Sequence, residues 1–132
     1  MEEIIEEQIK GIKLSKREQR LVALIYNFFK KRKLDKPSML YGNNHARISS
    51  YDVNKAIGTR SQFERVNILW SLQNKLRFTR EKPLFGCNAI ASIEDDNQIT
   101  EIEVTRAFYL IMNKYITEIV GKEYLIEVQS IN

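Results

Sequence analysis

Across residues 49–77, apolar residues recur at the three- and four-residue spacing that marks one face of a helix. A short helix is predicted first, capped by Ser49 or Ser50 and followed by Gly58, where a left-handed C-terminal residue is expected. A longer helix begins at once. Its predicted buried stripe consists of Phe63, Val66, Leu69, Trp70 and Leu76.

Two overlapping capping boxes, Thr59–Gln62 and Ser61–Glu64, mark the start of the longer helix. Its expected exposed face carries Arg60, Ser61, Gln62, Arg65, Asn67, Gln73, Asn74 and Lys75. Arginine pairs with guanine, and asparagine or glutamine with adenine, so this set of side chains suits base edges. Two helices around a glycine turn predict a helix-turn-helix, whose second helix enters a DNA major groove. Helical bundles that bind no nucleic acid contain the same pattern, and this alternative remains open.

An earlier helix is predicted from the capping box of Ser15 and Glu18. Its core-facing stripe consists of Leu21, Leu24, Ile25, Phe28 and Phe29. Its basic end consists of Lys30, Lys31, Arg32 and Lys33. These cations stabilise the negative end of the helix, which explains them without any ligand, and they are also candidate phosphate contacts. Pro37 stops the helix, and a loop up to His45 leads to a very short strand at Arg47–Ile48.

Beyond this helical part the period becomes that of strands. Residues 84–93 alternate loosely, with Phe85, Cys87, Ala89, Ala91 and Ile93 on one side. Alternation resumes over Ile99–Val104 after the turn residues Glu94–Asn97, which predicts a β-hairpin. Helix, short strand, helix, helix and hairpin is the element order of a winged helix. The acidic hairpin tip would be repelled by phosphate, so we expect that it does not contact DNA.

The two ends of the chain carry further amphipathic segments. Thr105 is the expected cap of a last helix, and Tyr124–Val128 is an expected final strand. The apolar stripe of this helix consists of Phe108, Ile111, Met112, Tyr115, Ile116 and Ile119. Leu110 and Val120 lie off the stripe. They either form a subunit contact or add to the core. Met1–Gly11 predicts an acidic arm, helical or extended, packed on the body or on a second subunit.

Basic charge is concentrated in the middle of the chain. Residues 10–82 carry 18 basic and 5 acidic side chains, whereas residues 83–132 carry 3 basic and 8 acidic ones. A phosphate-facing surface requires such a concentration, although charge runs also occur on faces that only meet solvent. The sequence shows no signal peptide and no run of ~18 apolar residues, which places the protein in the cytoplasm without a membrane partner.

The residue types of common catalytic sites are scarce. Cys87 is the only cysteine and His45 the only histidine, which argues against a disulfide, a zinc site and a paired-histidine metal site. There is no glycine-rich loop ending in Gly-Lys-Ser/Thr. The acidic set Asp95, Asp96, Glu101 and Glu103 suits Mg²⁺, but a turn and an outer strand face explain it as well. We therefore expect no enzyme, no cofactor, no metal and no small-molecule substrate.

Several segments resemble the N-terminal winged-helix domain of iteron-binding plasmid replication initiators. The matching pieces are Leu14–Leu21, Ile48–Val53, Ser61–Phe63 with Leu69, Leu72 and Leu76, then Ile99–Val104, Phe108 and Lys114–Ile116. The resemblance implies DNA binding, and dimerisation through this domain. The initiators carry a second winged helix for which 132 residues leave no room. The chain is then a one-domain relative or shares only the fold.

These patterns predict one α+β domain over 1–132, a winged helix-turn-helix with a hairpin wing and an additional C-terminal helix. Residues 1–13 form an arm, and 105–132 form a helix and strand that are a candidate homodimer contact. We expect binding of double-stranded DNA in replication initiation or transcription control of a plasmid or virus. The predicted DNA-binding residues are Arg60, Ser61, Gln62, Arg65, Lys75, Lys30, Lys31, Arg32, Lys33 and Arg47. The rival hypothesis is a winged-helix protein-interaction module that does not bind DNA.

Overall fold

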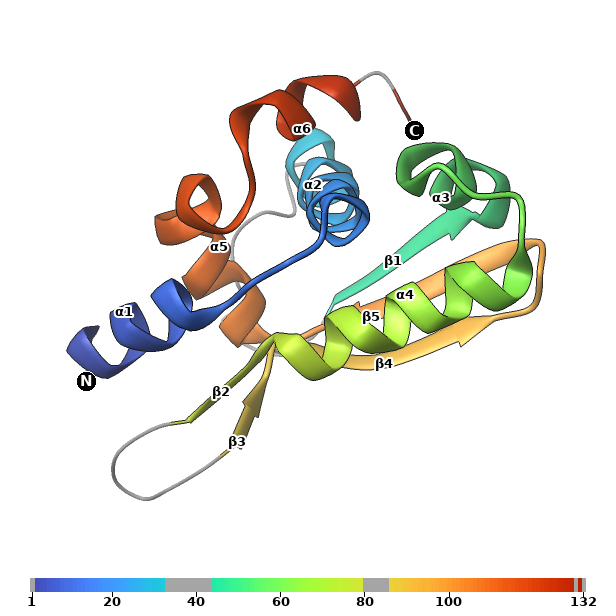
Figure 1. Ribbon diagram of the computed structural model, residues 1–132. Coiled ribbons are helices and arrows are strands. Elements are labelled where there is room, and N and C mark those ends of the chain that lie inside the picture. Colours follow the sequence, from blue (N-terminus) through green and yellow to red (C-terminus); the bar gives the residue numbers. More distant parts are fainter. Residues whose placement is uncertain (1, 33–43, 80–85, 130, 132) are drawn as a thin grey trace.

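A computed structural model describes residues 2–32, 44–79, 86–129 and 131, and its fold is mixed α+β (Figure 1). The elements are α1 (Glu2–Gly11), α2 (Lys16–Lys31), β1 (Asn44–Ser49), α3 (Ser50–Ile57), α4 (Gln62–Lys75), β2 (Arg77–Thr79), β3 (Gly86–Asn88), β4 (Ile90–Asp95), β5 (Ile99–Val104), α5 (Arg106–Ile119) and α6 (Lys122–Glu127). Lys33, the predicted helix stop at Pro37 and the predicted loop as far as residue 43 lie outside the described residues, whereas His45, predicted to end this loop, lies in β1.

An antiparallel sheet with the strand order β1-β5-β4 forms the centre of the fold. Its inner residues alternate with outer ones, so that Ala46, Ile48 and Ile102 are buried in the core. The helices α2, α3 and α4 pack against this sheet, and α6 packs on α2 (Figure 1). The short strands β2 and β3 pair as a second antiparallel sheet beyond the C-terminal end of α4.

Local capping signals are confirmed at three helix starts. Ser15 and Glu18 form the reciprocal capping box of α2. The Ser49 side chain accepts a hydrogen bond from the Asp52 backbone N–H in α3, and the Ser61 side chain accepts one from the Glu64 backbone N–H in α4. These bonds connect residues three apart, so the local sequence was sufficient to predict them.

Gly58 ends α3 with φ +74°, in the left-handed conformation that the sequence predicted. The backbone N–H groups of Gly58 and Thr59 both donate to the Asn54 carbonyl oxygen, at 2.8 and 3.1 Å. The turn between α3 and α4 is therefore closed by main-chain bonds, and it sets the direction in which α4 leaves.

The predicted buried stripe of α4 is confirmed at Leu69 and Leu76 but is wrong at Phe63 and Trp70. Its buried residues are Arg65, Leu69 and Leu72, followed by Leu76 at the C-cap. Phe63 and Trp70, which were expected in the core, are 75% and 56% exposed. The helix carries large apolar residues on more than one side, so their spacing alone did not determine which side faces the core.

The predicted strand over 84–93 is divided at Ala89 in the part that the structure describes. Residues of β3 pair with β2, while β4 begins at Ile90 and pairs with β5. An irregularity between Ile90 and Ser92 shifts the alternation, so Ile90 is buried and Ala91 is exposed. The hairpin of β4 and β5 is confirmed, but the two-residue alternation expected before it is not.

The C-terminal part differs from prediction in two respects. Residues expected as a final strand lie in α6, with Tyr124 buried. Thr105 does occupy the N-cap position of α5, but it makes no side-chain cap bond. Its hydroxyl instead donates to the Asn88 carbonyl oxygen at 2.6 Å, which ties the start of α5 to β3.

The predicted stripe of α5 is buried except for Ile116, which is half-buried, and Val120 belongs to the core rather than to a subunit contact. Met112, Tyr115 and Val120 all lie in the core, so substitution of the first two would disturb the fold rather than probe a subunit contact. Leu110 is the exposed apolar residue of this helix. The N-terminal arm is helical and buries Ile9, so it packs on the body of this same chain. No helix among the described residues is long and apolar enough to cross a membrane.

Candidate nucleic-acid interface

The surface of α4 that points away from the core consists of Phe63, Asn67, Trp70 and Asn74, which we call the outer face of α4. These residues are three and four positions apart and lie on one narrow stripe, opposite Leu69, Leu72 and Leu76. All four side chains are exposed. The stripe is uncharged, and it alternates large aromatic groups with amides that donate and accept hydrogen bonds.

Arg65 was expected on the exposed face, but it is buried with 1% of its side chain accessible. Its Nε and Nη2 atoms donate to the two carboxylate oxygens of Asp95 at 2.7 Å each. Nη1 donates to Asn54 at 3.0 Å and Nη2 also donates to Asn97 at 3.0 Å. Arg65 is therefore a structural residue that fixes α4 to α3 and to the β4–β5 turn.

Asp95, Asn54, Asn97 and Thr100 complete what we call the Arg65 network. Thr100 donates its hydroxyl to Asp95 at 2.7 Å, and the Asn97 backbone N–H donates to Asp95 at 2.9 Å. Burial alone would raise the pKa of Asp95, but the hydrogen bonds from Arg65 and Thr100 outweigh it and lower the pKa to about 2. The carboxylate is thus charged and fully engaged at neutral pH.

Asp95 and Asp96 of the β4–β5 turn have internal partners. Asp96 accepts hydrogen bonds from the backbone N–H groups of Gln98 and Ile99, at 2.9 and 2.7 Å. Asn97 has φ +70°, a left-handed conformation that asparagine tolerates. The acidity of this turn therefore has a structural cause, since the carboxylates close the turn and anchor α4.

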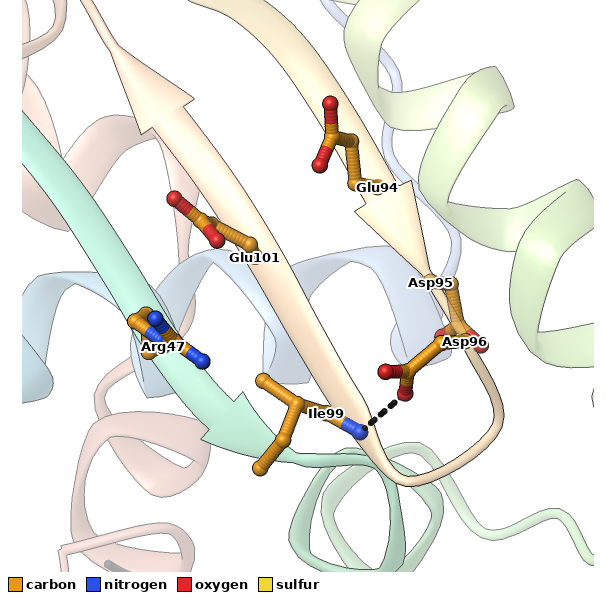
Figure 2. Close-up of a pocket in the computed structure, with 6 residues that line it drawn as sticks. All are labelled: Arg47, Glu94, Asp95, Asp96, Ile99 and Glu101. Carbon is orange, nitrogen blue, oxygen red and sulfur yellow. Dashed lines mark hydrogen bonds between the residues drawn. The ribbon is translucent and has the colours of Figure 1, made fainter.

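Arg47, a predicted DNA contact, lies in a different setting from α4. It is exposed on the outer face of β1 and lines a hollow with Glu94, Asp95, Asp96, Ile99 and Glu101. Figure 2 shows it beside Glu101 of β5, with Glu94 and Asp96 on the β4 side. The surrounding carboxylates make the local electrostatic potential more negative, which repels phosphate. Arg47 is therefore poorly placed for the predicted DNA contact.

Lys75 was also predicted to bind DNA, and the structure gives it an internal partner. Its ammonium lies 2.7 Å from a carboxylate oxygen of the buried Glu18, and Ser71 donates to the other oxygen at 2.8 Å. Burial raises the pKa of Glu18, but the bond from Lys75 and the bonds from Ser15 and Ser71 lower it further than burial raises it. Lys75 thus neutralises a buried carboxylate between α4 and α2.

The cations at the basic end of α2 have partners within the protein, Lys31 in the C-terminal part and Lys30 and Arg32 in α2 itself. Lys31 donates to the carbonyl oxygens of Gln129 and Ile131, and Arg32 lies over the Phe28 ring at 3.7 Å. Lys30 donates to the Tyr26 hydroxyl at 3.5 Å. All three cations are exposed, so these contacts still leave them accessible to phosphate.

A basic hollow lies where α3 turns into α4. It is lined by Tyr51, Asn54, Lys55, Thr59 and Arg60. The predicted residues Arg60 and Gln62 are exposed beside the N-terminal end of α4, whereas Ser61 is half-buried as the cap. Lys55 and Tyr51 were not predicted, although helical spacing from the buried Val53 and Ile57 places both on the outside of α3.

Within the described residues there is no group of three or more histidine, cysteine or carboxylate side chains placed to hold a metal ion. Comparison with protein-family models, with curated proteins and with solved structures finds no match for this chain.

Proposed function

We propose that this chain is a winged helix-turn-helix protein that binds double-stranded DNA through α4. The observation that carries the proposal is the combination of α3, Gly58 and α4 with an antiparallel sheet ordered β1-β5-β4. A short helix, a tight turn and a second helix with a free outer side is the arrangement that presents a helix to a major groove. In this assignment the β4–β5 hairpin is the wing.

The charges and side chains around α4 support the proposal. Lys55 and Arg60 flank the N-terminal end of α4, which is the end that meets base edges and phosphates in helix-turn-helix proteins. Gln62 is exposed beside them, and Asn67 follows on the outer face of α4. We assign Arg60 and Gln62 to the groove and Lys55 to the phosphate backbone, and we withdraw Arg65 from base reading because it is buried.

Binding of random-sequence duplex DNA at two salt concentrations tests this proposal. Each neutralised phosphate should lower log K by nearly one unit per unit of log salt. Arg60→Ala should cost about 1–3 kcal/mol on a preferred sequence and relax preference at one position. Lys122→Ala, an exposed cation on α6, is the matched control and should leave binding unchanged. No binding at ~50 mM salt would refute the proposal, since electrostatic attraction is strongest there.

A protein-interaction module is the second candidate, and one observation favours it. The outer face of α4 exposes Phe63 and Trp70 and has no charged residue, and exposed aromatic groups of this size are typical of protein interfaces. A protein partner that binds α4, together with no binding of duplex DNA, would point to this alternative. The presence of Lys55 and Arg60 at one end favours DNA.

Role and assembly belong to the same proposal. We infer that the protein acts in replication initiation or transcription control of a plasmid or virus, and that it does so as a homodimer, because paired half-sites suit two-fold symmetric proteins. Leu110 on α5 and Ile126 on α6 are the exposed apolar residues that a second copy would cover. Sedimentation of the wild type and of Leu110→Asp at ~100 μM tests this, at a concentration where specific dimers should form.

A further inference from the structure

From the outer face of α4, we infer that the protein prefers A·T base pairs and reads thymine methyl groups in the major groove. This inference rests on the proposed DNA binding and names the class of sequence that α4 takes. It uses two side chains that were expected in the core, Phe63 and Trp70, which are 75% and 56% exposed.

The residue types on the stripe are those that recognise A·T pairs. Asparagine makes paired hydrogen bonds to the N6 and N7 atoms of adenine, and apolar side chains contact the C5 methyl group of thymine. Asn67 and Asn74 supply the amides, while Phe63 and Trp70 supply the apolar surface. Arginine is the usual reader of guanine, but Arg65 is buried and the stripe itself carries no arginine.

The spacing along α4 supports contacts to more than one base pair. Phe63 and Trp70 are seven residues apart, which is about 10 Å along a helix at 1.5 Å per residue. Successive bases on one strand are about 3.4 Å apart, so the two aromatic side chains meet positions about three base pairs apart. Asn67 lies between them on the same side, where the intervening adenine would be.

Contacts with the rest of the protein hold α4 in a fixed orientation, so Phe63 and Trp70 are already exposed in the protein without DNA. Arg65 holds α4 to Asp95 of β4, and Lys75 holds its other end to Glu18 of α2. The Gln73 amide also donates to the carbonyl oxygens of Ile90 and Ala91, both at 3.3 Å. With its other sides engaged in this way, α4 presents the Phe63–Asn74 stripe outward without rearrangement.

The test compares duplexes that differ only in the methyl group. Three DNA duplexes of about 24 base pairs, roughly two helical turns, are titrated with the full chain at one salt concentration. They have alternating A-T, A-U (deoxyuridine in place of thymidine) and G-C sequences. Uracil lacks only the C5 methyl of thymine, and burying one methyl is worth roughly a fourfold change in affinity. We expect the A-T duplex to bind roughly 4- to 15-fold more tightly than the A-U duplex, and the G-C duplex to bind most weakly.

Variants assign the discrimination to the aromatic stripe. Phe63→Ala and Trp70→Ala should each reduce the ratio between the A-T and A-U duplexes, because only their contacts distinguish the methyl group. Lys122→Ala is the control, since this residue is exposed but lies on α6, outside the stripe, and it should keep the ratio. Circular dichroism confirms that each variant is folded.

The outcomes separate this inference from the proposed function. Equal binding of the A-T and A-U duplexes, with both bound tightly, overturns the methyl reading and leaves DNA binding intact. A ratio that survives both alanine substitutions also overturns it. Tighter binding of a single-stranded thymidine homopolymer, which cannot pair with itself, than of the A-T duplex assigns the stripe to base stacking and refutes groove reading. No binding to any duplex overturns the inference and the proposed function together.

Discussion

Asp95→Asn removes the negative charge from the buried pair that holds α4 against the β4–β5 turn. The asparagine keeps the size of the side chain and one acceptor oxygen. It places an amide nitrogen near Nε or Nη2 of Arg65, which are themselves donors at 2.7 Å from the present oxygens. The guanidinium, 1% exposed, would then be a buried cation without its counter-charge.

Two lines of reasoning give the magnitude. The pKa of Asp95 falls from its ordinary value of 3.8 to about 2, and each pH unit is worth about 1.4 kcal/mol, which gives about 2 kcal/mol for the charged over the neutral acid. Removing one partner of a buried ion pair costs about 3–5 kcal/mol, because the other charge stays buried. We expect Asp95→Asn to lose about 2–5 kcal/mol of a total stability of about 5–15 kcal/mol.

Urea unfolding followed by circular dichroism measures this loss. Asp96→Asn is the control, because it is the same chemical change one residue further on, at an exposed side chain whose amide oxygen still accepts the two backbone N–H groups. Its unfolding midpoint should move less than that of Asp95→Asn. Arg65→Met with Asp95→Asn completes a double-mutant cycle, in which the coupling energy should exceed about 1 kcal/mol.

Equal midpoint shifts for Asp95→Asn and Asp96→Asn would refute this reasoning. So would a coupling energy near zero, because it would mean that Arg65 and Asp95 do not interact in the native state. A variant of Asp95 that does not fold at all is consistent with the upper end of the range. Arg65→Lys then gives a graded result, since lysine keeps the charge but loses the two parallel hydrogen bonds.

Three further predictions concern stability. Folding lowers the pKa of Asp95, so its contribution to the free energy of unfolding is complete above about pH 4 and is lost as the pH falls towards 2. In this pH window, the acid unfolding of Asp95→Asn should therefore depend less on pH than that of the wild type. Glu18→Gln should cost about 1–3 kcal/mol in urea unfolding, because Lys75 and Ser71 lose a charged acceptor at a buried site; a cost within error of zero would contradict the role given to this carboxylate. Gly58→Ala should lower the free energy of unfolding by about 1–2 kcal/mol, because φ is +74° at this residue. Gly11→Ala, at the end of α1 with open space around it, should be neutral or stabilising. Equal thermal midpoints for the two variants would speak against strain at Gly58.

Sequence reasoning succeeded where the interactions are local. The caps at Ser15, Ser49 and Ser61, and the left-handed Gly58, depend on residues within a few positions of each other. It failed at the last segment, where Tyr124–Val128 alternates like a strand but lies in α6 and its C-cap, Val128. A short helix at this position buries Tyr124 in the core. A strand would need a neighbouring strand to pair with, and the described sheets place none beside this segment.

The candidate site shows the same division more sharply. The sequence by itself determined that a polar and aromatic helix follows Gly58, because capping and turn chemistry are written in adjacent residues. Only the tertiary structure decided which side of that helix is outside. Arg65 finds Asp95 thirty residues away, and that buried pair, together with Leu69 and Leu72, turns Phe63 and Trp70 outward. When a helix carries apolar residues on several sides, its own sequence does not determine which side faces the core. Contacts with residues far away in the sequence then determine which face is exposed to a ligand.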